Sequence, residues 1–506
     1  MSFLASPRWR IFLIAWIIYS VHFATNIVRE HYPAFSLVSH GTFRVDEYQG
    51  FHADIFVHRD GHSVIGNQVF VSALAAVPLF VFDPLLNALE EYSKRQPGMA
   101  DGEYHTDKPN RVKFFRLVKE RGLLLRFAAA AVVTSVFFMA PLTAAFLVLM
   151  YNIFRQRGVT QGFATELTFL CGFCTPLFFR TSHLNHNMFI MYAMFLSFYL
   201  MWIQPGGDYP VSLKRRLAAG LFGGITLATD YMGALILPLL YGYLFICRLS
   251  SASWKQSFKE SLAFVAGSVP PILFLLYTQW AMYGNPFLPG QHWMPDQNEY
   301  TQIGMRGFSL PSPDLFLMNL FHPGYGIYSW GPVLLMGLIP AIWYRADKLI
   351  LPRRERRMVA IYFISILLFS SANQYARLQW NSGFRYLVPL VPFICLALAD
   401  HWVRLPRWSR IAIAIVAGIH SWILTVFREI SLQQSWSDFL HEGIQLPWFR
   451  VIRMTSARDS WLLNGQVVPI AILSLTFLTC WMIWRLGSRR ETQRAATVKV
   501  PSTVVV

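Results

Sequence analysis

Long apolar runs without charge recur along the 506-residue chain and constrain its fold more than any other feature. The first extends from Ile11 to about Val28, and similar runs continue almost to the C-terminus. Such stretches cross a bilayer as helices, because a helix satisfies its own backbone hydrogen bonds in lipid. Only 14% of residues are charged, against roughly a quarter in soluble proteins. We therefore predict an all-α polytopic membrane protein.

Twelve membrane-spanning helices are predicted. The first is Ile11–Val28, and the others are expected at about 123–150, 161–179, 188–203, 217–230, 233–247, 262–283, 329–344, 358–372, 386–403, 411–427 and 466–484. The first run lacks a small-x-small cleavage site, so we expect an uncleaved anchor. Residues 1–484 then form one transmembrane domain. The basic, then Thr/Val-rich segment 485–506 is expected to be a disordered cytoplasmic tail.

Basic residues predict the orientation. The formal net charge of +17 comes mostly from Lys and Arg in short loops between apolar runs, which is typical of positive-inside topology and not of nucleic-acid binding. Both termini are then cytoplasmic, and 29–122 is one extracytoplasmic loop. The run Val69–Leu86 inside this loop either crosses the membrane or lies on its outer surface. A crossing would invert every later loop, so we favour a surface helix.

Several enzyme and redox classes lack their usual sequence signals. The five cysteines fall in or beside apolar runs, and the Cys171-x-x-Cys174 pair is interpreted as helix packing. The chain has no Gly-rich phosphate loop, Walker lysine or G-x-S-x-G nucleophile motif. The sequence therefore lacks the motifs that ATP-driven transporters and serine hydrolases usually contain.

The acidic pair Asp46-Glu47, in the long first loop, is the first candidate for chemistry. A carboxylate partly desolvated at the membrane boundary has a raised pKa and can accept a proton from a hydroxyl group. It could also bind a divalent cation. The alternative is a solvated pair of loop residues, which is common.

The same loop continues with a mixture of imidazole and carboxylate groups that suits a metal ion. Asp46, Glu47, His52 and Asp54 are candidate ligands, and Mg²⁺ or Mn²⁺ the candidate ion. His58, Asp60 and His62 follow, but their spacing matches no sharp metal motif. Hydrogen-bonded loop structure is the alternative for all of these residues.

Other polar groups mark the outer ends of later runs. Arg385, Arg306 and Arg377 carry guanidinium groups suited to a phosphate at the membrane surface, although contact with lipid headgroups is the alternative. A second group caps the third span and either lines a wet cavity or satisfies the helix end; it comprises His183, Asn185, His186 and Asn187. Asp230 is an intramembrane acid or the boundary of a helix pair.

The layout resembles the GT-C-type integral membrane glycosyltransferases, and most closely their bacterial branch of protein-mannosyltransferase-like and aminoarabinose-transferase-like proteins. Three segments carry the likeness: the acidic segment Arg44-Val45-Asp46-Glu47-Tyr48 of the first loop, the run from Asn67 to Leu86, and the aromatic-Gly-Phe-x-Arg-Tyr segment from Trp380 to Leu390. Many relatives place a second Asp in the next outer loop, where this chain has His183, Asn185, His186 and Asn187. This departure puts a metal bridged by two acids in doubt.

The resemblance implies a reaction at the outer face of a bacterial inner membrane. Asp46 would deprotonate a hydroxyl of a glycan, lipid or protein acceptor, with Glu47 assisting. The acceptor oxygen would invert the anomeric carbon of a polyprenyl-phosphate-linked sugar, while Arg385, Arg306 and Arg377 bind the donor phosphate. Membrane lipid would surround the cleft, and substrate contacts are expected from Tyr48, His52, Asp54, His183, His186, Asn187 and Tyr386.

Two other functions remain open. A transporter or flippase of lipid-linked intermediates would have internal repeats and broken helices in paired positions. The tight pair 217–247 gives slight support, whereas the large polar first loop argues against it. An O-antigen ligase or polymerase would carry its chemistry in a late outer loop, within 284–328 or 428–465.

Overall fold

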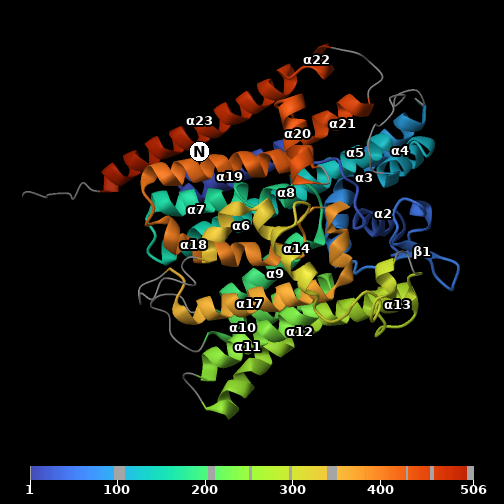
Figure 1. The fold of residues 1–506 in the computed structure, drawn as a ribbon, viewed down its shortest axis with the longest axis horizontal. Coiled ribbons are helices and arrows are strands. Elements are labelled where there is room, and N and C mark those ends of the chain that lie inside the picture. Colours follow the sequence, from blue (N-terminus) through green and yellow to red (C-terminus); the bar gives the residue numbers. More distant parts are fainter. Residues whose placement is uncertain are drawn as a thin grey trace, which may run out of the picture.

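The computed structural model describes residues 2–95, 109–202, 211–249, 253–295, 299–338, 350–381, 383–428, 431–455 and 461–498. Their regular structure is helical apart from one two-stranded hairpin, β1 (Ile55–Val57) paired antiparallel with β2 (Ser63–Ile65). Several helices, including α12, α17 and α19, run in a similar direction across the molecule (Figure 1). This architecture confirms the predicted all-α fold.

The helices of the main bundle follow one another with short connections. Their bounds are α1 (Pro7–Val21), α5 (Leu124–Thr134), α6 (Ala140–Gln156), α7 (Gln161–Phe173), α8 (Leu177–Thr181), α9 (His186–Met201), α10 (Leu213–Thr229), α11 (Gly233–Leu249), α12 (Trp254–Tyr283), α17 (Arg353–Ala372), α18 (Val391–Trp402), α19 (Arg407–Phe427) and α23 (Val467–Val498). The π-helical segment Ser135–Met139 joins α5 to α6.

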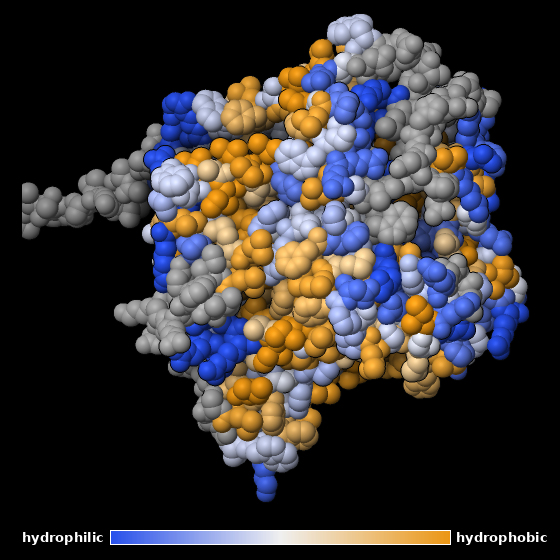
Figure 2. All heavy atoms as spheres, viewed as in Figure 1, coloured by the Kyte–Doolittle hydropathy of each residue, from blue (hydrophilic) through white to orange (hydrophobic). Residues whose placement is uncertain are grey.

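Apolar side chains gather on the surface of the bundle. Figure 2 shows apolar residues through the middle of the visible face and hydrophilic residues gathered toward its left and right margins. Five helices in the described residues are long and apolar enough to cross a membrane, namely Phe70–Arg95, Leu124–Gln156, Trp254–Tyr283, Arg407–Phe427 and Val467–Glu491. Because water does not tolerate such exposed apolar surface, the protein is membrane-embedded.

Helices occupy nearly all the ranges predicted to span the membrane. There are two exceptions. Helix α1 ends at Val21, before the predicted end at Val28. In 329–344 the structure describes only the short helices α15 (Ile327–Trp330) and η6 (Pro332–Gly337) before residues outside the described part. Shorter apolar helices, such as α9, account for several other ranges. The total of twelve spans therefore stays a prediction.

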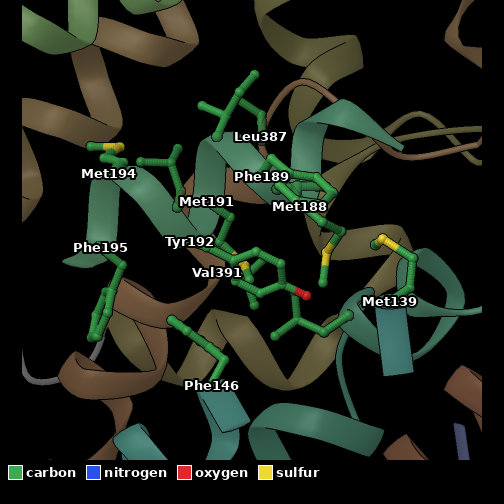
Figure 3. Close-up of a cluster of buried hydrophobic side chains, with 14 of the residues drawn as sticks. Met139, Phe146, Met188, Phe189, Met191, Tyr192, Met194, Phe195, Leu387 and Val391 are labelled. Carbon is green, nitrogen blue, oxygen red and sulfur yellow. The ribbon is translucent and has the colours of Figure 1, made fainter. Parts of the chain in front are cut away.

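Helix α9 lies at the centre of the core and is buried almost all round. Figure 3 shows its Met188, Tyr192 and Phe195 among neighbouring apolar side chains, with Phe146 and Val391 on other elements. Such a helix shows no polar face, because each of its sides packs against protein. Its N-terminus, capped by Asn185, is consequently held rigidly.

The first helix of the bundle, α1, contacts the last one, α23. Buried Arg10 on α1 binds Ser488 and Glu491 on α23, and Gln161 also binds Glu491. These contacts hold α23 as a helix to Val498, whereas the sequence predicts disorder from residue 485. The rest of that predicted tail, 499–506, lies outside the described residues.

The first loop folds into α2 (His31–His40), the hairpin, α3 (Phe70–Arg95) and α4 (Pro109–Glu120). Together with α13 (Gly290–Trp293), these elements gather at one end of the bundle, on the right of Figure 1, which we call the loop end. Helix α3 packs on α2 and α5. Near the end of α3, Glu90 accepts a hydrogen bond of 2.6 Å from Arg126, which lies at the start of α5. Length and composition would let α3 cross a membrane, so the surface position of this helix stays a prediction.

Candidate functional site

Asp46 and Glu47 lie on the surface of the first loop and contact different partners. Their side chains are 49% and 60% exposed. Asp46 accepts the Ser63 N–H and lies 3.1 Å from His62 Nδ1, whereas Glu47 lies 2.9 Å from His40 Nε2. The two carboxylates therefore belong to separate contacts.

The pKa of Asp46 differs from the sequence expectation. Burial raises it, but the hydrogen bonds from Ser63 and His62 and the charge of Arg44 together hold it below the ordinary value of an aspartate. The expected rise in pKa is thus wrong, because solvent and hydrogen-bond donors stabilise the charged form.

The metal-ligand candidates do not converge. Asp46 binds Ser63 and His62, Glu47 binds His40, and Asp54 binds Arg29 and Asn67. Across the described ranges, no group of three or more His, Cys, Asp or Glu side chains is arranged to hold a metal ion. The proposed divalent cation does not fit the residues suggested for it.

A buried charged network lies where α2 and α9 begin. Glu30 Oε1 lies 2.6 Å from His186 Nδ1 and 3.4 Å from Arg29 Nε. Arg29 also approaches the His186 ring nitrogens to 3.2 Å. Because isolated charges in a protein interior are very costly, mutual pairing is what permits this burial.

Two more acids complete this network, which we call the acid–histidine network: Arg29, Glu30, Asp54, His186 and Asp230. Asp54 Oδ2 accepts hydrogen bonds from Arg29 at 3.1 Å and from Asn67 at 2.7 Å. Asp230 Oδ2 lies 3.5 Å from His186 Nε2. The network thus joins three segments far apart in sequence.

Two carboxylates of the network, Glu30 and Asp54, are held in their charged form. Burial raises the pKa of Glu30, but His186 and Arg29 outweigh it and lower the pKa well below its usual range. Burial likewise raises the pKa of Asp54, and His52, Arg29 and Asn67 bring it below normal. The described hydrogen bonds of the Asp54 carboxylate all use Oδ2, so Oδ1 can accept another proton donor.

A cluster of cations adjoins the network. Buried Arg180 donates to the carbonyls of Phe384 and Gly383, and Arg428 donates to the carbonyl of Phe179. Between the two guanidinium groups lies His183, 3.0 Å from Arg428 Nη2 and 3.4 Å from Arg180 Nη1. We call Arg180, His183, Arg385 and Arg428 the cationic cluster.

The charges around Arg180 and His183 shift the pKa values of both groups. Burial lowers the pKa of Arg180 far below its ordinary value, and the charges of Arg385 and Arg428 lower it further, while Glu30 opposes the shift. Burial, followed by the charges of Arg428 and Arg180, lowers the pKa of His183, which keeps its ring neutral. The Glu30 charge thus acts directly on the cationic cluster.

Within the described residues, His183 and Arg385 each leave a donor group without an acceptor. A neutral imidazole has one acceptor nitrogen, yet both ring nitrogens of His183 face guanidinium groups. Arg385 lies 4.8 Å from the ring of Tyr386, and its buried Nε has no hydrogen-bond partner in the described residues. An anion would supply the acceptors that this arrangement lacks.

The backbone at Gly383 places two members of the cluster. Its φ of +71° is in the left-handed region, and its carbonyl accepts from Arg180 two residues before Arg385. A Cβ atom there would lie 2.7 Å from Trp330 and 3.1 Å from Phe179. Glycine is therefore required both by conformation and by space.

The other predicted site residues divide by location. Arg377 is paired with Asp314 at 2.6 Å, and Arg306 binds the carbonyls of Met294 and His292. These two arginines are therefore bound to groups outside the cationic cluster. Tyr48 is buried among the rings of Tyr32, Phe35, Phe51 and Phe127, which makes it a core residue.

Five predicted substrate contacts belong to the two clusters or lie next to their members in the chain or in space. His186 is in the acid–histidine network and His183 in the cationic cluster. His52 accepts the Asp54 N–H on Nδ1 at 3.1 Å. Asn187 is 1% exposed, and its Nδ2 has no partner in the described part of the chain. Tyr386 lies under the Arg385 guanidinium.

Sequence reasoning missed Glu30, Arg29 and Arg428 as site residues. A usable signal was present, because Arg29-Glu30 is the first charged pair after the first apolar run and Arg428 directly follows the run ending at Phe427. Charges at such positions sit at the ends of apolar helices, where burial depends on the partners that tertiary structure provides.

Comparisons with known proteins give no family. No protein-family model, curated protein or solved structure matches this chain. Its function must therefore be argued from the site itself.

Proposed function

We propose that this protein is a membrane glycosyltransferase that moves a sugar from a polyprenyl-phosphate-linked donor to an acceptor hydroxyl. The loop end would face the extracytoplasmic side, with twelve spans and both termini cytoplasmic. The observation that carries the proposal is that a cationic cluster lies beside buried carboxylates. Arg180 and His183 precede His186 in one short buried segment, and the Glu30 charge acts on both of them. Glycosyl transfer from a lipid phosphate needs both, an anion site and a proton acceptor.

The cationic cluster suits the donor phosphate. Guanidinium groups bind phosphate oxygens in pairs, and a buried site strengthens each bond. Phosphate becomes more negative as the sugar–phosphate bond breaks, so Arg180 and Arg385 would stabilise the transition state more than the ground state. This assignment keeps the predicted role of Arg385 and replaces Arg306 and Arg377, which have structural partners.

Asp54 is our candidate for the base. The acceptor oxygen attacks the anomeric carbon, its proton passes to Asp54 Oδ1, and the sugar–phosphate bond breaks with inversion to release polyprenyl phosphate. Asp54 is supported by its available oxygen and by Arg29 and Asn67, which fix its other oxygen. Glu30 and His186 would act as positioning residues, because they hold Arg29. Asp46 stays the alternative base, separated from this network by its exposed position.

The direct test is sugar transfer by the full-length protein in lipid nanodiscs, offered a panel of polyprenyl-phosphate hexoses and pentoses. We expect wild-type protein to consume a donor with inversion. Arg385→Ala should raise the donor KM about tenfold, the effect of losing one charge-assisted hydrogen bond. Arg306→Ala, the matched control, should stay within about twofold, because Arg306 binds the carbonyls of Met294 and His292.

Other outcomes would identify the competing functions. Movement of the intact lipid-linked sugar across the bilayer, with no cleavage of its sugar–phosphate bond, would replace the enzyme with a transporter. Activity that survives changes to Asp54 and Asp46 but disappears on substitution within 431–455 would favour the ligase-type alternative.

A further inference from the structure

Helix α14 (Pro313–Phe321) differs from the other apolar helices in length and position. Its nine residues extend about 14 Å, roughly half of a bilayer core. Leu317 and Phe321 are 58% and 54% exposed, and Met305 and Leu310 just before the helix are each 86% exposed. This short element presents an apolar surface, although it cannot cross the membrane.

The opposite face of α14 is buried and carries Leu315 and Asn319. Asn319, only 1% exposed, accepts a hydrogen bond on Oδ1 from Gln379 Nε2 at 3.1 Å. At the start of the helix, Asp314 pairs with Arg377 at 2.6 Å. Both contacts tie α14 to η7 (Gln374–Asn381), the segment that leads into the cationic cluster.

Gln379 connects this face to Arg385. Its Oε1 accepts the backbone N–H of Arg385 at 3.3 Å and that of Tyr386 at 3.1 Å. One side chain therefore bonds α14 with its amide nitrogen and the Arg385 backbone with its oxygen. Displacement of α14 would be transmitted to the position of Arg385.

We propose that the exposed face of α14 binds the hydrocarbon chain of the lipid-linked donor, and that Asn319 and Gln379 couple chain binding to the placement of Arg385. This inference rests on the proposed function. A lipid phosphate bound at Arg385 must direct its chain toward lipid, and α14 is an apolar surface bonded directly to that segment. Chain binding would bury exposed apolar area and hold the phosphate-binding arginine in place.

Chain-length dependence tests the proposal. The sugar donor is supplied with a long polyprenyl chain or with a chain of two isoprene units. Leu317→Ser should raise the KM of the long-chain donor about tenfold and leave the short-chain KM within about twofold, because only the long chain buries this leucine. Leu273→Ser on α12 is the matched control, since Leu273 is also 58% exposed. Equal KM effects of Leu317→Ser on both donors would overturn the proposal.

A second variant tests the coupling between chain binding and the position of Arg385. Asn319→Ala removes the acceptor for Gln379 without touching the exposed face, so it should reduce the ratio of short-chain to long-chain KM toward one. A variant that keeps the wild-type ratio would show that this hydrogen bond does not transmit chain binding, and would overturn the coupling.

Photo-crosslinking separates failure of this proposal from failure of the enzyme assignment. A photoreactive phenylalanine replaces Leu317 or Leu273, and the probe is radiolabelled polyprenyl phosphate without sugar. We expect stronger labelling at 317, with competition by unlabelled polyprenyl phosphate and not by bulk phospholipid. Equal labelling at both positions, or competition by phospholipid, would refute chain binding even if sugar transfer is observed. Selective labelling without sugar transfer would support chain binding and reject the transferase.

Discussion

Two acidic regions of the first loop differ sharply in their surroundings. Asp46 and Glu47 form a conspicuous pair in the sequence, but solvent reaches about half of each side chain. Asp54, eight residues after Asp46, is 19% exposed and shares a network with Glu30 and His186, which are less than 10% exposed. Acidic residues close together in one loop therefore have very different surroundings.

The difference shows that burial and partners, more than sequence pattern, distinguish a reactive carboxylate. The hydrogen bonds of Asp46 come from its own loop, whereas the network joins Asp54 to residues from α9 and from the end of α10. A low-dielectric surrounding strengthens electrostatic interactions with a substrate, which an exposed pair cannot match.

The largest expected effect comes from making the same substitution in both regions. Asp54→Asn should reduce kcat about 10²–10⁴-fold, since it removes the proton acceptor. Asp46→Asn should leave kcat within about threefold. Both variants are assayed for sugar transfer in nanodiscs after their thermal stability is matched to wild type. Full activity in a well-folded Asp54→Asn protein, with loss in Asp46→Asn, would return the role of base to Asp46.

The second prediction concerns the pH dependence of folding stability that comes from the buried His31 of the first loop. Burial lowers the pKa of His31 to about 4, although Glu30 and the Val28 carbonyl oppose the shift. The unfolded chain, with a histidine pKa near 6.5, binds more protons between these values, so stability present above pH 6.5 is lost as the pH falls toward 4. The expected loss is about 3 kcal/mol for this group.

Thermal unfolding in detergent between pH 7 and pH 4 measures this loss. His31→Gln should flatten this pH dependence of stability. Identical profiles for wild type and His31→Gln would contradict the neutral buried state of His31.

The smallest expected effect compares two glycines with positive φ. Gly383→Ala should destabilise the protein by about 2 kcal/mol, because a Cβ atom meets Trp330 and Phe179 in addition to the backbone strain. Gly61→Ala in the exposed hairpin has open space around it and should cost about 1 kcal/mol from strain alone. Denaturation midpoints of both variants test the difference. Equal midpoints would mean that the Gly383 region repacks freely.

The sequence by itself determined the membrane class and most helix positions. Apolar runs long enough to cross a bilayer can fold there only as helices, so their pattern was sufficient to predict α1, α12 and α19. It also identified Arg385, His183 and His186 as polar groups at helix ends. Local signals of this kind do not depend on which helices become neighbours.

Tertiary structure alone decided which polar groups meet. Glu30 reaches His186 across 156 positions, and Arg180 reaches the Phe384 carbonyl across 204. It also decided that Asp46 stays exposed and that Arg377 is neutralised by Asp314. The physical reason is that the cost of burying a charge depends on its partners, and these come from helices whose packing no local pattern specifies.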